Sequence, residues 1–279
     1  MTDPFRITGP TCISFGGGRT SAYLLWRVLQ AHDMSLPEDA LVLFCNTGKE
    51  EEATLEFVRD CSEWCPITWL EYREGPSFEV VTFETASRNG EPFDAVIKQR
   101  EPSLPNGRSR YCSSELKTRT MHRHLRSIGW TEWDSLIGIR ADEPRRVAKF
   151  RSNPHPETPS ETVCLPLVSA GVGAHDVGKF WSNQPFDLAL PNNNGKTMHG
   201  NCDLCFLKPA HQVFSLIAER PERAIYWANH EKEAAKRCTG DGQFFAIDRP
   251  SYAQMLKFSQ EQRDMFDPSE EGIACFCGD

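Results

Sequence analysis

The chain has 279 residues and a formal net charge of -8, from 31 Lys and Arg against 39 Asp and Glu, which disfavours a broad basic surface that coats a nucleic-acid duplex. With 39% hydrophobic and 25% charged residues, the composition is typical of a globular protein and excludes a disordered or collagen-like chain. No apolar run approaches the roughly 18 residues of a membrane helix, so we expect a cytoplasmic protein without a membrane partner.

The N-terminal part of the chain predicts strands that alternate with helices. Residues Thr11–Phe15 predict a buried strand, which runs through three glycines into a helix over Ala22–Leu29. A second strand is expected over Ala40–Cys45, followed by a helix that opens in the acidic stretch Glu50–Glu52, and a third strand over Ile67–Tyr72. Because this alternation requires crossover connections, it predicts an α/β fold with a mainly parallel sheet and helices on both faces.

The pattern weakens farther along the chain. Prolines interrupt residues 73–107, which we expect to form a partly irregular insertion near the substrate. A basic helix is expected from Ser113 to Arg126, and another strand over Ser135–Arg140. The proline-rich stretch Asn153–Ser160 marks a boundary, so we expect an α/β domain over residues 1–150 and a smaller, mostly helical region over 151–279. The helices expected in that region are Val177–Trp181, Pro209–Ala218 and Pro221–Lys236.

The glycine-rich turn after the first strand predicts an anion site. Such a turn exposes backbone N–H groups at the N-terminus of a helix, where the positive end of the helix dipole favours phosphate. Glycines allow close approach of an anion, hydroxyl groups can donate hydrogen bonds, and an arginine can neutralise charge. A turn that only tightens the packing is the alternative. The candidate residues are Ser14, Gly16, Gly17, Gly18, Arg19, Thr20 and Ser21.

Five of the eleven cysteines indicate a metal site. Cys202 and Cys205 form a CxxC pair, which places two thiolates on one centre, and two more soft donors would complete a tetrahedral zinc site or an iron–sulfur cluster. Cys112 and the terminal Cys275 and Cys277 are the candidates for those donors, unless these three are incidental. Without a signal peptide, reduced thiols, a metal site or redox chemistry are favoured over disulfides.

The other cysteines have a simpler interpretation. Cys12, Cys45 and Cys164 lie in apolar, strand-like segments, which is typical of small core residues. Cys61 and Cys65 are four residues apart, a spacing that fits either a metal or one buried face of a helix.

Basic residues follow Cys112 and recur after the predicted strand Ser135–Arg140. In a chain that is acidic overall, such a concentration favours a polyphosphate or nucleotide pocket over a solvated face. The residues are Lys117, Arg119, His122, Arg123, His124, Arg140, Arg145 and Arg146.

Four segments taken together resemble the phosphoadenosine phosphosulfate reductase family: Ser14–Ser21, Cys45–Lys49, Cys112–Lys117 and Gly138–Arg146. That family belongs to the adenine-nucleotide α-hydrolase-like group, which includes the ATP pyrophosphatases. The ordered combination is more specific than any one motif. In the glycine loop, Gly16 stands where ATP pyrophosphatases have a serine.

The resemblance implies a Rossmann-like sheet with an adenine nucleotide bound above its carboxyl edge. Asn46, Thr47 and Gly48 would then lie beside the glycine loop, and ATP with magnesium would be the substrate. Lys117, Arg140 and Arg145 would stabilise the charge that develops on the phosphates. The resemblance thus implies a catalytic role for these three residues.

The related adenylyl-sulfate reductases hold a [4Fe–4S] cluster with a cysteine pair and a later CxxC. By this resemblance the ligands here would be Cys112, Cys202, Cys205 and one terminal cysteine, either Cys275 or Cys277. With Cys275 as the ligand, Cys277 would be free to accept or deliver sulfur. Zinc is the alternative occupant.

Three functions stay open on the sequence alone. The first is an ATP pyrophosphatase-like enzyme that activates a substrate for sulfur transfer. The second is a phosphoadenylyl-sulfate or adenylyl-sulfate reductase, and the third is a non-catalytic nucleotide- or zinc-binding component of a larger complex. The acceptor of sulfur, a nucleic-acid or protein partner and a homodimer are left open as well.

Overall fold

The structure, a computed structural model, describes residues 3–155, 158–192, 197–200 and 202–265. The chain divides into two compact units, of which the first comprises Met1–Gln99 and Arg110–Asp203 and the second Arg100–Ser109 and Leu204–Asp279. Residues 151–203, which the sequence assigned to the C-terminal region, thus fold with the first unit. The division lies at residue 203, whereas the proline-rich stretch had suggested residue 150.

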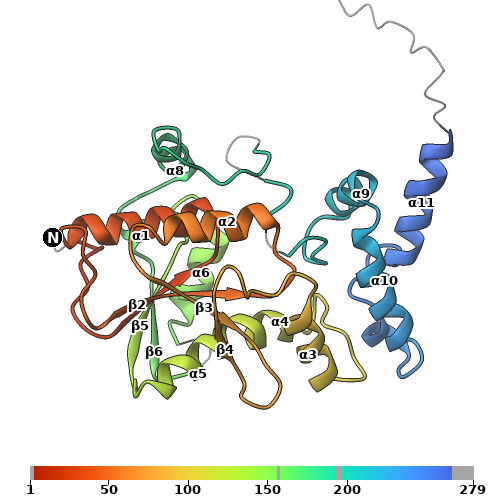
Figure 1. The fold of residues 1–279 in the computed structure, drawn as a ribbon, viewed down its shortest axis with the longest axis horizontal. Coiled ribbons are helices and arrows are strands. Elements are labelled where there is room, and N and C mark those ends of the chain that lie inside the picture. Colours follow the sequence, from red (N-terminus) through yellow and green to blue (C-terminus); the bar gives the residue numbers. More distant parts are fainter. Residues whose placement is uncertain (1–2, 156–157, 193–196, 201, 266–279) are drawn as a thin grey trace, which may run out of the picture. The chain divides into compact units, whose positions relative to one another are not determined.

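The first unit is built on one six-stranded sheet with the strand order β4-β3-β2-β1-β5-β6 (Figure 1). All neighbouring strands run parallel except β3 and β4, which are antiparallel. The predicted α/β class with a mainly parallel sheet is therefore confirmed. The strands are β1 Thr11–Phe15, β2 Ala40–Asn46, β3 Ile67–Glu71, β4 Glu79–Val81, β5 Trp133–Ile137 and β6 Glu161–Cys164.

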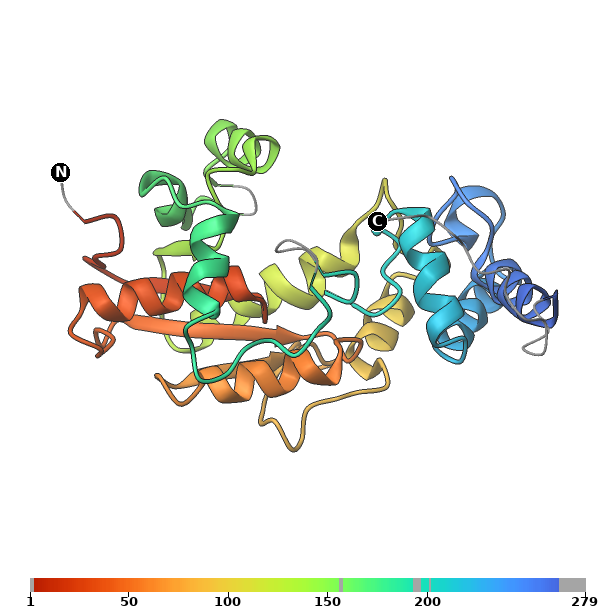
Figure 2. The ribbon, with the colours of Figure 1, turned by 90° about the horizontal axis from the view of Figure 1, so that it is seen from above.

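Helices cover both faces of this sheet. The side chains of α1, α2 and α8 pack on one face, and those of α5 pack on the other (Figure 1). In the turned view of Figure 2, α8 (green) lies against α1 (red to orange). The helices of this unit are α1 Arg19–Ala31, α2 Glu52–Cys61, α3 Glu91–Gln99, α4 Tyr111–Ser113, α5 Arg119–Ser127, α6 Pro144–Ser152, α7 Pro166–Ser169 and α8 Ala174–Trp181, with a π-helical turn over Ser114–Thr118.

Two parts of the first unit are more regular than the sequence indicated. Residues 73–107 contain the edge strand β4 and the helix α3, although an irregular insertion was expected. β6 follows the proline-rich stretch directly and pairs with β5. Short strands with polar residues give too few alternating positions for a clear periodicity, which explains why both strands escaped prediction.

The structure assigns most of the remaining cysteines to the core. Cys12 and Cys45 are buried between the sheet and α5, as expected for small core residues. Cys61 and Cys65 pack in the core on the opposite face, but Cys61 is the last residue of α2 and Cys65 lies in the turn that follows, so the two do not share a helix face. Burial raises the pKa of Cys45 to about 12 and that of Cys65 to about 11. These thiols therefore stay protonated at neutral pH.

The described part of the second unit is helical, with α9 Ala210–Glu219, α10 Arg223–Ala234, α11 Tyr252–Met265 and a 3-10 turn over Gly240–Gln243. Its core contains the stacked rings of Trp227 and Tyr252. The buried carboxyl of Glu231 accepts hydrogen bonds from the backbone N–H groups of Phe245 and Tyr252, at 3.3 and 2.9 Å. Burial raises the pKa of Glu231 to about 7. Among the described helices, none is long and apolar enough to cross a membrane.

Candidate functional site

The turn after β1 and the segment after β5 meet at the carboxyl edge of the sheet. Gly138, which directly follows β5, lies so close to α1 that a Cβ atom there would be 3.2 Å from the backbone nitrogen of Ser21. The guanidinium of Arg140 donates a hydrogen bond to the Thr20 hydroxyl across 3.2 Å. Two segments that the sequence singled out separately are thereby brought into contact.

The glycine turn itself requires glycine at its centre. Gly17 has a φ of +71°, and a Cβ atom there would approach the Thr54 side chain to 2.7 Å. Gly18 is the N-cap of α1, and the Ser21 hydroxyl donates to its carbonyl oxygen at 2.9 Å. The first N–H groups of a helix have no partner within the helix, so the first turn of α1 offers donors to an anion.

The turn after β2 is held by a buried side chain. The amide nitrogen of Asn46 donates to Glu71 Oε1 at 2.6 Å and to the Ser87 carbonyl at 2.8 Å, and its oxygen accepts from the Gly48 N–H at 3.1 Å. Gly48 has a φ of +75°. Asn46 and Gly48 thus determine the conformation of this turn. The Thr47 hydroxyl donates a hydrogen bond to Glu50 Oε1 at 3.2 Å.

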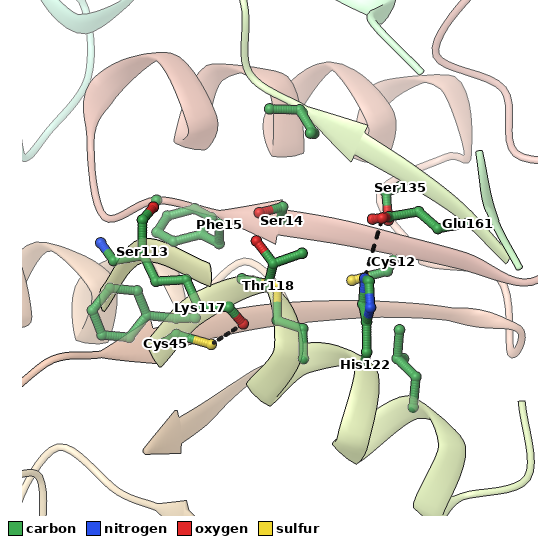
Figure 3. Close-up of a pocket in the computed structure, with 15 residues that line it drawn as sticks. Cys12, Ser14, Phe15, Cys45, Ser113, Lys117, Thr118, His122, Ser135 and Glu161 are labelled. Carbon is green, nitrogen blue, oxygen red and sulfur yellow. Dashed lines mark hydrogen bonds and ion pairs between the residues drawn. The ribbon is translucent and has the colours of Figure 1, made fainter. Parts of the chain in front are cut away.

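A partly enclosed cavity of about 190 Å³ lies between the sheet and the segment that contains the π-helical turn and α5 (Figure 3). It extends along β1 and is bordered by the ends of β2 and β5 and by the start of β6. The lining residues with polar side chains are Cys12, Ser14, Cys45, Ser113, Lys117, Thr118, His122, Ser135 and Glu161.

Lys117 provides the positive charge at the outer end of the cavity. It lies in the π-helical turn, and such turns are frequent at functional sites because they change the direction of side chains within a helix. Its ammonium is 3.4 Å from Oε1 of the buried Glu50. The negative charge of Glu50 raises the pKa of Lys117 above its ordinary value, despite the opposing effect of burial. Lys117 is therefore charged throughout the physiological pH range.

The other predicted basic residues are largely engaged with carboxylates. Arg119 and Arg123 both pair with Glu115, at 2.8 and 2.9 Å. Within the glycine turn, Arg19 makes a bidentate pair with Asp187, with N–O distances of 2.6 and 2.7 Å. Arg19 is compensated by its own carboxylate, whereas Arg119 and Arg123 share one, so the basic pocket contains less uncompensated positive charge than the sequence suggested.

The arginines Arg140 and Arg146, which follow β5, are also paired with carboxylates. Arg140 pairs with Asp142 at 2.8 Å, in addition to its contact with Thr20. Arg146 pairs with Glu143 at 2.6 Å. Arg145 is exposed on α6 and does not line the cavity.

The structure brings one of the predicted cysteine ligands to this site. The sulfur of Cys202 is 3.3 Å from the Thr47 hydroxyl. Cys112 is partly buried in α4, and Cys205 belongs to the second unit. Cys275 and Cys277 lie outside the described residues. Within the described residues, no group of three or more His, Cys, Asp or Glu side chains is arranged to hold a metal ion.

The inner end of the cavity contains His122, which the sequence analysis placed in the basic pocket, together with Ser135 and Glu161, to which it gave no role at a site. Glu161, at the start of β6, accepts a hydrogen bond from the Ser135 hydroxyl at 2.6 Å and lies 3.2 Å from His122 Nε2 (Figure 3). Because the sequence analysis did not predict β6, it assigned Glu161 to a loop. The sequence signal for a functional role of Glu161 was a glutamate next to apolar and β-branched residues, and this signal is weak by itself.

The fold and the site together define an α/β protein with a mostly parallel sheet and a polar cavity near the carboxyl ends of its central strands. The sequence is 29% identical over 216 residues to an uncharacterized nin region protein, ORF290, of Escherichia phage lambda. This match covers 72% of the present chain and 67% of the phage protein. No family model matches the sequence.

Proposed function

We propose that the first unit binds an adenine nucleotide and that the protein is an ATP pyrophosphatase-like enzyme, which activates a substrate for sulfur transfer. The observation that carries this proposal is that the glycine turn begins at Gly16, which lines the cavity together with Lys117, and that the segment after β5 contacts the same turn through the hydrogen bond from Arg140 to Thr20. The choice of an adenine nucleotide comes from the family resemblance of the motifs in these segments.

The order of the strands supports the location of the site. From β1 the chain crosses over to β2 on one side, and the strand on the other side of β1 is β5. In open α/β sheets, ligands bind outside the carboxyl ends of the strands at the point where the strand order reverses. That point is the end of β1, where the glycine turn begins.

The residues at this edge suit phosphoryl chemistry. The N–H groups in the first turn of α1 and the hydroxyl of Thr20 would hold the phosphates. Attack of a substrate oxygen on the α-phosphate would form a new P–O bond and release pyrophosphate. Lys117 would stabilise the charge that develops on the phosphate oxygens. A cluster, or the thiol of Cys277, which lies outside the described residues, would deliver the sulfur.

Pyrophosphate release tests this function directly. The purified protein should release pyrophosphate from ATP faster than it releases sulfite from adenylyl sulfate or its 3′-phosphorylated form. Both assays are run with reduced thioredoxin, which supplies the two electrons that sulfite release requires, and with and without nucleic acid as a candidate acceptor. Faster release of sulfite would identify a sulfonucleotide reductase instead, and binding without turnover of either nucleotide would identify a non-catalytic module.

A [4Fe–4S] cluster on Cys112, Cys202, Cys205 and Cys275 is a separate proposal. The described residues do not form such a group, so we derive no step through the cluster. When bound, it would supply electron or sulfur transfer. Zinc on the same thiolates is the alternative.

Metal analysis distinguishes these two occupants. Protein purified without oxygen should contain about four iron and four sulfide ions per chain and absorb broadly in the visible range. Replacing Cys202 by serine should reduce the iron content, whereas replacing the core residue Cys61 by alanine should not. A colourless protein with one zinc per chain would contradict the cluster.

A further inference from the structure

Unpaired polar atoms gather at the inner end of the cavity. In the described part of the chain, four buried side-chain nitrogen or oxygen atoms have no hydrogen-bond partner, and three of them belong to His122, Trp133 and Glu161. His122 Nε2 and Glu161 Oε2 are 3.2 Å apart as an ion pair, but the angles between them do not make a hydrogen bond. Both residues line the cavity, and each is only 5% exposed. A buried polar atom without a hydrogen bond is costly, so His122 Nε2 and Glu161 Oε2, which belong to residues that line the cavity, indicate a ligand that completes their hydrogen bonding.

The charge state of Glu161 determines which hydrogen-bonding groups the ligand must have. Burial by itself would raise the pKa of Glu161, but His122 and Ser135 outweigh it and hold the pKa below its ordinary value. Glu161 is therefore ionised at neutral pH and can only accept hydrogen bonds. Ser135 already occupies its Oε1 atom, so Oε2 is the atom that faces a donor. The neighbouring imidazole can donate or accept, depending on its tautomer.

The space and the walls suit a flat ring. A cavity of about 190 Å³ corresponds to the share of roughly six liquid water molecules, enough for a bicyclic ring. Apolar side chains form much of its walls, and the hydroxyl groups of Ser14 and Thr118 lie between its two ends (Figure 3). The apolar lining residues include Phe44, Met121, Leu125 and Ile137.

The distance between the inner end of the cavity and the glycine turn matches the length of a nucleoside. Cys12, at the inner end, and Gly16, at the outer end, both line the cavity and are four residues apart along the chain. At about 3.3 Å per residue, they are separated by roughly 13 Å. A nucleoside extended along β1 would therefore place its base at the inner end when its phosphates are at the turn.

We propose that the inner end of the cavity is the base-recognition subsite, where Glu161 accepts a hydrogen bond from an exocyclic amino group and His122 bonds the adjacent ring nitrogen. This inference rests on the proposed nucleotide-binding function and adds the orientation of the base and the residues that select it. An amino group at position 6 of a purine satisfies Glu161, whereas an oxo group there would place two acceptors against each other.

The first test changes the ligand and leaves the protein intact. Binding of ATP, ITP and purine riboside triphosphate, which lacks the 6-amino group, is measured by calorimetry. The wild-type protein should bind ATP about 10-fold to 100-fold more tightly than either of the others, because a charged acceptor is left unpaired without the amino group. Equal affinities for ATP and purine riboside triphosphate would overturn the inference.

The second test uses Glu161→Gln. Because Ser135 donates to the atom that becomes the amide oxygen, the new NH₂ group would face the base and favour an oxo group. The variant should bind ITP more tightly than the wild type does and ATP more weakly. A merely structural defect would weaken both nucleotides equally, and that result would overturn the inference. Glu231→Gln, a buried glutamate in the second unit, is the control and should leave the preference for ATP unchanged.

These experiments separate the two proposals. If the wild-type protein binds ATP but does not discriminate the 6-amino group, the nucleotide-binding function stands and the base subsite is wrong. If none of the three nucleotides binds, the proposed function fails, and the subsite fails with it.

Discussion

Replacing Gly17 by alanine should destabilise the first unit by about 2 to 4 kcal/mol, as judged from the usual costs of a left-handed non-glycine residue and of overpacking. Both costs arise at this position. The backbone has a φ of +71°, and a Cβ atom would lie 2.7 Å from the Thr54 side chain. Because α2 carries Thr54 in the core against β2, the turn can yield only if a helix moves. Urea denaturation followed by circular dichroism measures the loss.

Gly18 provides a matched control one residue away. Its φ is -121°, and no atom lies within 4 Å of the position of a Cβ atom. Gly18→Ala should therefore cost only the loss of a favourable N-cap residue, about 1 kcal/mol or less. Equal stability of the two alanine variants would contradict the close packing described for the turn.

The sequence was sufficient for the elements that carry strong local signals. Thr11–Phe15 is a strand with the bounds that its apolar run predicted, and the three parallel strands up to Glu71 were recognised in order. The register of β5 beside β1 depends on contacts between residues more than a hundred positions apart, which no local pattern contains. The strand order of the sheet therefore required the structure.

The candidate site was predicted only in part, for an equally physical reason. A motif marks residues whose backbone or charge is unusual within a few positions, as in the glycine turn and at Lys117. It does not show whether a charge is compensated by a distant residue, as Asp187 does for Arg19. Likewise, Glu161 and His122 gain their significance from an encounter between β6 and α5, which the sequence does not reveal.

Replacing Lys117 by methionine should reduce pyrophosphate release from ATP by about 100-fold to 1,000-fold, the usual cost of removing one group that stabilises a developing negative charge. Methionine preserves the length and the apolar stem of the side chain and removes only the charge. The raised pKa of Lys117 means that the wild-type group is protonated up to its ordinary pKa and beyond. We therefore expect no loss of activity from deprotonation of this group between pH 7 and 9, as measured by initial rates across that range.

The buried Glu50 complicates this variant and also provides its control. Its carboxylate is 3.4 Å from the Lys117 ammonium, and the side chain is only 3% exposed, so Lys117→Met leaves a buried charge without its cation. The single variant should therefore be less stable, because an isolated buried charge is unfavourable. Adding Glu50→Gln should restore stability but not activity, because the amide removes the unpaired charge and supplies no cation to the phosphates. Recovery of activity in the double variant would show that Lys117 acts only on the fold.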